Sequence, residues 1–115
     1  MRKENSTNTI NKKRIVYNCG MSYTLTTIGG RWKPAILFRL CRNKMRYSEL
    51  RNAIPGVTER MLALQLRELE KDGLIKRIVY AEVPPRVEYE LTPKGISLKP
   101  ILQSLSDWGD VNRIS

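Results

Sequence analysis

The chain has 115 residues, of which 41% are hydrophobic and 28% are charged, and both fractions are ordinary for one globular domain. Lysine and arginine total 21 against 11 aspartate and glutamate residues, so the formal net charge of +10 indicates an anionic partner such as nucleic acid or a membrane surface. The sequence contains no histidine and no run near the roughly 18 apolar residues of a membrane-spanning helix, which argues against an enzyme and against a membrane protein.

The first 15 residues are basic and poor in apolar side chains, which predicts a flexible N-terminal arm over residues 1–15. This arm is either a solvated tail or a basic segment that lies along DNA. No apolar signal-peptide core follows it, so we expect a cytoplasmic protein. Residues 16–112 are then expected to form the single folded domain.

Two helices are predicted in the first third of this domain. The segment over residues 20–28 can form a short helix that ends at the two glycines following it. A second helix over residues 32–42 is apolar on several sides, so we expect it at the centre of the core. Pro34 fits its first turn, where a missing amide costs nothing. Cys41 lies on this helix and is expected to be a buried small hydrophobe.

The middle of the chain predicts a helix-turn-helix unit. A short extended piece precedes Ser48, which is the expected N-cap of a helix over residues 49–54. The sequence IPGV then predicts a tight turn. Thr58 can cap a longer helix that runs to Asp72, and Gly73 follows where a left-handed residue is favoured.

Two strands over residues 75–81 and 87–92 are expected to pair as a hairpin. Pro84 and Pro85 donate no backbone hydrogen bond, so they mark its tip and stiffen it. A last helical region carries apolar side chains on one face, and Pro100 either lies near its start or kinks it. The expected fold is therefore mainly α with a small β-hairpin wing, a winged helix-turn-helix.

The longer helix of this unit would lie in the major groove of double-stranded DNA. On a helical wheel its leucines face the core, and a cationic stripe faces outward. Residues near its start reach base edges in such folds, and those candidates are Thr58, Glu59, Arg60, Ala63 and Leu64. Arg67, Lys71 and Arg86 are expected to contact phosphates, and Ser48 is a further DNA-binding candidate. The alternative is an ordinary solvated face with charge pairs within the helix.

The chain resembles the HxlR family of bacterial winged-helix transcriptional regulators, relatives of the MarR type, in four segments that occur in the family's order: TLTTIGGRWKPAILFRL, RYSELRNAIPGVTERMLALQLRELEKDGLIKR, VYAEVPPRVEYELTPKG and LSDWG. The resemblance covers about residues 19 to 109. It implies a homodimer, formed through the terminal helices, that binds a pseudo-palindromic operator. The dimer-interface candidates are Tyr23, Leu25, Leu98, Ile101, Leu102, Leu105 and Trp108. The alternative is that these side chains belong to the chain's own core.

Many members of this family carry a cysteine just before the first helix, and in some it senses oxidants or electrophiles. Cys19 occupies that position, so it is either a redox sensor or a structural thiol. The spacing of Cys19 and Cys41, without histidine, does not match a metal site, and no cofactor motif is present. We therefore predict no metal and no cofactor, and the small-molecule effector is unknown from the sequence.

Two other functions are compatible with the same charges. A basic architectural or RNA-binding protein would use them without sequence choice, and its binding would depend steeply on salt. A protein-interaction module could use the winged helix as a scaffold, since a fold does not fix a function.

Overall fold

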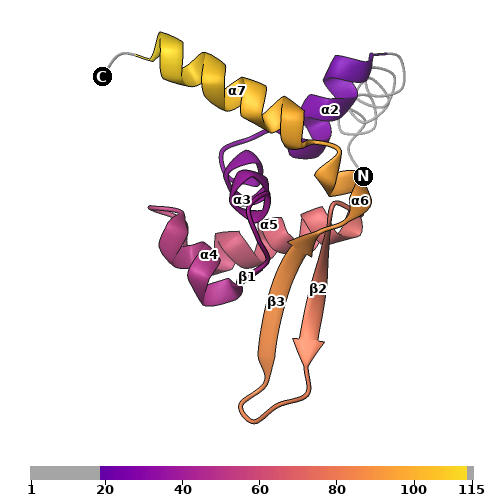
Figure 1. Ribbon diagram of the computed structural model, residues 1–115, viewed down its shortest axis with the longest axis vertical. Coiled ribbons are helices and arrows are strands. Elements are labelled where there is room, and N and C mark those ends of the chain that lie inside the picture. Colours follow the sequence, from indigo (N-terminus) through magenta and orange to yellow (C-terminus); the bar gives the residue numbers. More distant parts are fainter. Residues whose placement is uncertain (1–18, 114–115) are drawn as a thin grey trace, which may run out of the picture. The chain divides into compact units, whose positions relative to one another are not determined.

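The computed structural model describes residues 19–113 (Figure 1). These residues fall into two compact parts, of which the first ends at Gly30 and the second begins at Arg31. The first part contains helix α2, Gly20–Ile28, as the sequence predicts. Its last turn is closed by the Gly29 amide, which donates to the Leu25 carbonyl at 2.8 Å. The arm predicted over residues 1–15 lies outside the described residues.

The second part is mainly helical and carries a three-stranded antiparallel sheet, which confirms the predicted winged helix-turn-helix class. Its elements, in chain order, are α3 (Lys33–Leu40), β1 (Met45–Arg46), α4 (Tyr47–Ala53), α5 (Glu59–Lys71), β2 (Ile75–Tyr80), β3 (Arg86–Leu91), α6 (Pro93–Ile96) and α7 (Lys99–Asn112). In Figure 1 the β2–β3 hairpin projects beyond the helices of this part, as a wing.

The sheet is larger than the predicted hairpin. Its strand order is β1-β3-β2, so β3 lies between the other two. In β1, Met45 pairs with Tyr89 and Arg46 pairs with Glu88. A strand of two residues is too short to show the alternating pattern by which strands are recognised, which explains why the sequence indicated only an extended piece here.

The core of this part is built around α3, as its apolar sequence predicts. Helix α3 packs against α4, α5, α7 and β3. Burying these leucine and isoleucine side chains contributes about 1.5–3 kcal/mol each. The side chains that are almost fully buried are Ile36, Leu37, Leu50, Leu62, Leu66, Leu69, Leu74 and Ile75.

Helix α4 begins earlier than predicted, and Ser48 is not its N-cap. The helix starts at Tyr47, and Arg46 occupies the cap position. The Glu49 carboxylate accepts a hydrogen bond from the Arg46 amide at 2.7 Å. The first turn is thus closed by a side chain within the helix that reaches back to the backbone of the cap residue. Ser48 therefore lies inside the first turn, where its side chain is exposed.

The predicted ends of α5 are confirmed. The Thr58 hydroxyl accepts a hydrogen bond from the Met61 amide at 3.1 Å, as an N-cap does. Gly73 follows the C-cap residue with a φ of 75°, in the left-handed region that disfavours other residues. The open question at Pro100 is also answered, because α7 begins at Lys99 and places Pro100 in its first turn without a kink.

Cys41 is less buried than predicted. Helix α3 ends at Leu40, and Cys41 follows it as the C-cap residue with a half-buried side chain. Burial raises the pKa of this thiol, and nearby Lys99 opposes that effect. Cys41 also lines a surface cavity beside the start of α7. The error arises because the helix is one turn shorter than its apolar sequence suggests.

Candidate nucleic-acid interface

Helices α4 and α5 are fixed to each other at the turn that joins them. The turn places Ile54 and Val57 in the core, together with Leu50 of α4. The Tyr47 hydroxyl donates a hydrogen bond to the Glu59 carbonyl at 2.7 Å, which links the first turn of α4 to the first turn of α5. Burial raises the pKa of Tyr47, and the Glu59 charge raises it further, so this phenol stays protonated and able to donate.

Helix α5 separates an apolar face from a cationic face. Leu62, Leu66 and Leu69 are buried against the rest of this part. The exposed side carries the cations Arg60, Arg67 and Lys71. Within residues 19–113 no ion pair involves any of these three residues.

The acidic residues of α5 that form ion pairs do so with other elements. Glu68 pairs with Lys33 of α3 at 2.7 Å, and the Lys33 side chain is only 13% exposed. Glu59 pairs with Arg51 of α4 at 2.9 Å. No ion pair within α5 is therefore present in the described residues, so no carboxylate in direct contact neutralises these three cations.

The predicted base-contact residues lie together in the first half of α5. Thr58, Glu59 and Arg60 are exposed, Ala63 is half-buried, and the Leu64 side chain is 40% exposed. The Thr58 hydroxyl is already used in the cap, and the Glu59 carboxylate is held by Arg51. That ion pair is exposed at the surface, where such pairs contribute only about 0–1 kcal/mol.

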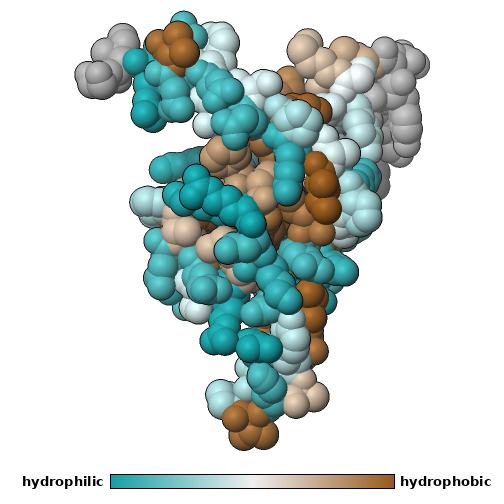
Figure 2. Space-filling view, in the orientation of Figure 1, coloured by the Kyte–Doolittle hydropathy of each residue, from teal (hydrophilic) through white to brown (hydrophobic). Residues whose placement is uncertain are grey.

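The wing carries an apolar tip. Residues 81–85 connect its strands, and Val83 there is fully exposed. Pro84 and Pro85 are in this connection, which confirms the predicted position of the two prolines. Figure 2 shows hydrophobic atoms at this tip, with hydrophilic surface next to them.

Arg86 is engaged by the wing itself. It is the first residue of β3 and the cross-strand partner of Tyr80, and its guanidinium lies 4.1 Å from the centre of the Tyr80 ring. Its Nε lies 3.7 Å from a Glu82 carboxylate oxygen and 3.9 Å from a Glu88 oxygen. The predicted phosphate contact of Arg86 would therefore compete with two carboxylates and one aromatic ring.

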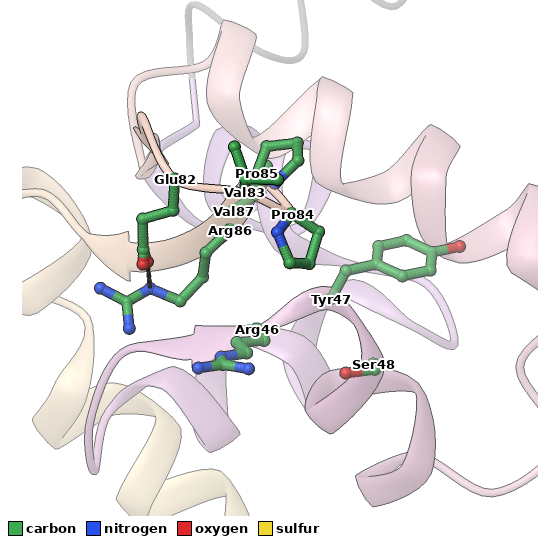
Figure 3. Close-up of a pocket in the computed structure, with 9 residues that line it drawn as sticks. All are labelled: Arg46, Tyr47, Ser48, Glu82, Val83, Pro84, Pro85, Arg86 and Val87. Carbon is green, nitrogen blue, oxygen red and sulfur yellow. Dashed lines mark ion pairs between the residues drawn. The ribbon is translucent and has the colours of Figure 1, made fainter.

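A cleft of about 550 Å³ separates this wing from the start of α4 (Figure 3). Arg46, Tyr47 and Ser48 line one wall, and residues 82–87 line the other. Arg46 was not among the candidates predicted from the sequence, and neither were Tyr47 and Arg51, which orient α5. Glu49, three residues after Arg46, was the available signal, but arginine is not a usual N-cap residue. The contacts of Tyr47 and Arg51 join separate elements and leave no local signal.

The dimer candidates of α7 are mostly exposed in this chain. Ile101 is 45% exposed, Leu105 is 53% exposed and Trp108 is 71% exposed, whereas Leu98 is half-buried. Leu102 is 3% exposed and lines a small cavity with residues of α3, so it belongs to the chain's own core. On α2, considered by itself, Tyr23 is 43% exposed and Leu25 is 58% exposed.

Cys19 is the N-cap residue of α2. Its pKa is lowered chiefly by a hydrogen bond from the Ser22 side chain, with further contributions from the amides of Ser22 and Met21. These donors stabilise the thiolate, which is the reactive form of a cysteine. Cys19 and Cys41 are both free thiols.

In the part of the chain that the structure describes, no three His, Cys, Asp or Glu side chains are placed to bind a metal ion. None of the helices formed by residues 19–113 is both long and apolar enough to cross a membrane.

Comparison with known proteins gives consistent results. The sequence model of the HxlR-like helix-turn-helix family matches residues 27–114. The chain is 47% identical over 105 residues to YybR of Bacillus subtilis (strain 168), an uncharacterized HTH-type transcriptional regulator, and the match covers 89% of this chain and 84% of YybR.

Solved structures show the same likeness. The redox regulator HypR in its oxidized form superposes with a TM-score of 0.81 at 46% identity, covering 84% of this chain and all of HypR. The reduced form of the transcriptional regulator YodB from B. subtilis superposes with a TM-score of 0.72 at 33% identity, covering 82% of this chain and 92% of YodB.

Proposed function

The chain belongs to the HxlR-like helix-turn-helix family of transcriptional regulators, which are not enzymes, and from this premise we propose that it acts as a homodimer on a pseudo-palindromic DNA operator. The recognition helix of each protomer is α5, which lies in the major groove of one half-site. A cytoplasmic location belongs to the same proposal, because the DNA that such a regulator binds is there.

The observation that carries the proposal is the cationic face of α5. Arg60, Arg67 and Lys71 are exposed on the side opposite the buried leucines, without ion pairs among the described residues. Arg60 lies near the helix start, from which a guanidinium can reach the O6 and N7 atoms of guanine. Arg67 and Lys71 lie further along, where phosphates pass the helix. The basic segment over residues 1–15 adds charge that can follow the backbone.

The proposed dimer forms through the terminal helices. The exposed apolar side chains of α7 are the main support, since a lone chain would leave them in water. Two-fold symmetry would then present two α5 helices to successive major grooves, about 34 Å apart. An inverted repeat with that spacing between half-site centres is the expected operator.

The proposed regulation acts through Cys19. Two features support it: the lowered pKa of the thiol at the start of α2, and the likeness to HypR, which is a redox regulator. Oxidation or alkylation would change the charge and size of this side chain next to a proposed dimerisation helix. A change in dimer geometry would alter the spacing of the two recognition helices, and with it the affinity for the operator.

The test begins with selection of DNA from a random pool by the reduced full-length protein, at about 0.15 M salt and with excess competitor DNA. The expected result is an enriched inverted repeat that the protein protects in a footprint. Uniform binding to every sequence, lost as salt rises, would favour the architectural protein instead.

The same footprint is then repeated after treatment with an oxidant. Loss or displacement of protection in the wild type, but not in a Cys19→Ser variant, is the expected result. A Cys41→Ser variant serves as the matched control and should still respond. Equal responses of the wild type and the Cys19→Ser variant would exclude Cys19 as the sensor and leave the DNA-binding proposal standing.

A further inference from the structure

The cleft between the wing and α4 has a cation on each wall. Arg46 lies on the α4 wall and Arg86 lies on the wing wall. In Figure 3 the Arg86 side chain points to Glu82, whereas the Arg46 side chain and the Ser48 hydroxyl lie on the opposite side of the cleft. Both Arg46 and Ser48 are exposed. The two walls therefore differ in how far their charge is already neutralised.

The two carboxylates of the wing are paired with cations other than Arg46. Glu88 is 14% exposed and has Lys44 Nζ at 3.7 Å and Arg86 Nε at 3.9 Å. Glu82 has Arg86 Nε at 3.7 Å. Lys44 also donates a hydrogen bond to the Tyr80 hydroxyl at 3.2 Å, and this contact raises its pKa and keeps it charged.

Arg46 is the cation of the cleft that has no carboxylate partner for its guanidinium in the part of the chain that the structure describes. It is the cross-strand partner of Glu88 in the pairing of β1 with β3, yet no ion pair in residues 19–113 includes it. Three cations, Lys44, Arg46 and Arg86, and three carboxylates, Glu49, Glu82 and Glu88, therefore lie around the cleft. Glu49 accepts a hydrogen bond from the Arg46 backbone amide, and the Arg46 guanidinium is in no ion pair among the described residues. An exposed guanidinium and a hydroxyl that line the same cleft are each suited to a phosphate, since both groups donate to its oxygens.

We infer that this cleft binds one phosphate of the DNA backbone in each half-site, with the Arg46 guanidinium and the Ser48 hydroxyl as its ligands. This inference rests on the proposed function and names a contact within it. Arg86, which the sequence suggested for this role, remains with Tyr80, Glu82 and Glu88 on the wing.

The opposite wall fits the sugar that adjoins such a phosphate. Val83 is fully exposed and Pro84 lines the cleft, so the wall facing Arg46 presents apolar groups. A DNA strand alternates charged phosphates with apolar deoxyribose faces, and the apolar part of the wing wall offers a surface for the sugar next to a phosphate at Arg46. The prolines restrict the backbone of this wall, which lowers the entropy lost when the strand binds. This contact positions the protein without reading bases.

Arg46 can be changed without removing the local structure that it begins. The cap of α4 is the hydrogen bond that the Arg46 backbone amide donates to Glu49. The Arg46 side chain takes no part in it, so every variant except proline keeps this bond. Arg46→Gln removes the charge, and Arg46→Lys keeps it. Lys99→Gln is the matched control, because it removes one charge on α7, where Lys99 lines other cavities than this cleft. Thermal unfolding of each variant shows whether the fold is intact.

The first measurement is the dependence of DNA affinity on salt. Each lost phosphate contact lowers the slope of log K against log salt concentration by about 0.9. For Arg46→Gln we expect the slope to fall by this amount for each protomer that binds. The slope of Lys99→Gln should equal that of the wild type, and the slope of Arg46→Lys should stay near it. Ser48→Ala should weaken binding roughly tenfold, because a hydrogen bond to a charged group is lost. An unchanged slope in a folded Arg46→Gln variant would overturn the inference.

The second measurement locates the phosphate. The probe is a duplex carrying the selected inverted repeat, in which single phosphates are replaced one at a time by uncharged methylphosphonates. The wild type should lose affinity at one symmetric pair of positions where Arg46→Gln loses nothing further, while Lys99→Gln keeps the wild-type pattern. Identical patterns for the wild type and Arg46→Gln would overturn the inference while leaving the proposed operator binding intact.

The inference remains testable if selection yields no operator. In that case a random 30-base-pair duplex still gives the salt slopes of the three proteins. A failure of sequence selection with a lower slope for Arg46→Gln would refute the proposed operator but support the phosphate cleft. If selection yields no operator and the slope of Arg46→Gln equals that of the wild type, both the proposed operator and the phosphate cleft are refuted.

Discussion

Replacing Leu105 by alanine should weaken the proposed dimer by an amount that the structure allows us to estimate. Complete burial of a leucine side chain contributes about 1.5–3 kcal/mol. Leu105 is 53% exposed in the single chain, so roughly 1 kcal/mol remains to be gained when a partner covers it. Each dimer contains two copies, so Leu105→Ala should cost about 2 kcal/mol, which corresponds to roughly a 30-fold higher dissociation constant.

Sedimentation of the purified protein over a wide concentration range, without DNA, measures this constant directly. Val79→Ala is the matched control, because Val79 is 56% exposed but lies on β2 of the wing. The control should dimerise like the wild type. Because Leu105 also lines a small cavity beside α3, urea unfolding at low concentration is needed to separate a weaker dimer from a weaker fold. Equal dissociation constants for both folded variants would show that the apolar face of α7 is not the interface.

Substitutions at four further residues test the roles assigned to α5 and to Cys19. Arg60→Ala should cost about 1–3 kcal/mol at one base position of the selected operator and relax the choice there, whereas Lys71→Ala should weaken all sequences alike and lower the salt slope by about one unit. Equal losses on every sequence for both variants would contradict this division of roles. Thr58→Ala should lower the free energy of unfolding by about 1 kcal/mol in urea titrations, because the cap hydroxyl is lost, and Thr58→Ser should restore it. Equal stability of Thr58→Ala and wild type would show that the cap contributes nothing. Ser22→Ala should raise the pKa of Cys19, since Ser22 is the main cause of its lowering, so alkylation near neutral pH should slow and the rise of the rate should move to higher pH. Alkylation profiles that coincide, measured with the second cysteine replaced by serine, would remove the proposed activation of this thiol.

The sequence predicted well those features that depend on neighbouring residues. The cap at Thr58 and the left-handed Gly73 are set by local backbone preferences, so the limits of α5 could be predicted to within a residue. The two prolines at the wing tip are explained in the same way. Pro100 left two local possibilities open, and only the structure shows that α7 begins at Lys99.

Features that join distant segments could not be predicted. The strand β1 exists because β3 pairs with it, and two residues give no periodic signal. The hydrogen bond from Tyr47 to Glu59 spans the turn between two helices, and it was found only once those helices were placed. The cap of α4 at Arg46 was missed for a related reason, because its acceptor is the Glu49 side chain rather than the cap residue itself.

Contacts between distant segments also decide which cations are free to bind DNA in the proposed function. A net charge of +10 predicts an anionic partner, but it treats every lysine and arginine alike. In the structure, carboxylates from neighbouring elements neutralise some of them: Lys33 is paired with Glu68, Lys76 with Glu90, and Arg86 with the acids of the wing. Others have no such pair among residues 19–113, and they include Arg46, Arg60, Arg67 and Lys71. These four are on α5 and beside the wing cleft, the surfaces proposed to meet DNA, whereas Lys99, which also has no ion pair among the described residues, lies on α7. A contact with phosphate therefore requires both an unpaired charge and a place on the proposed DNA-binding surface, and Arg86 is the residue on that surface whose charge is already paired.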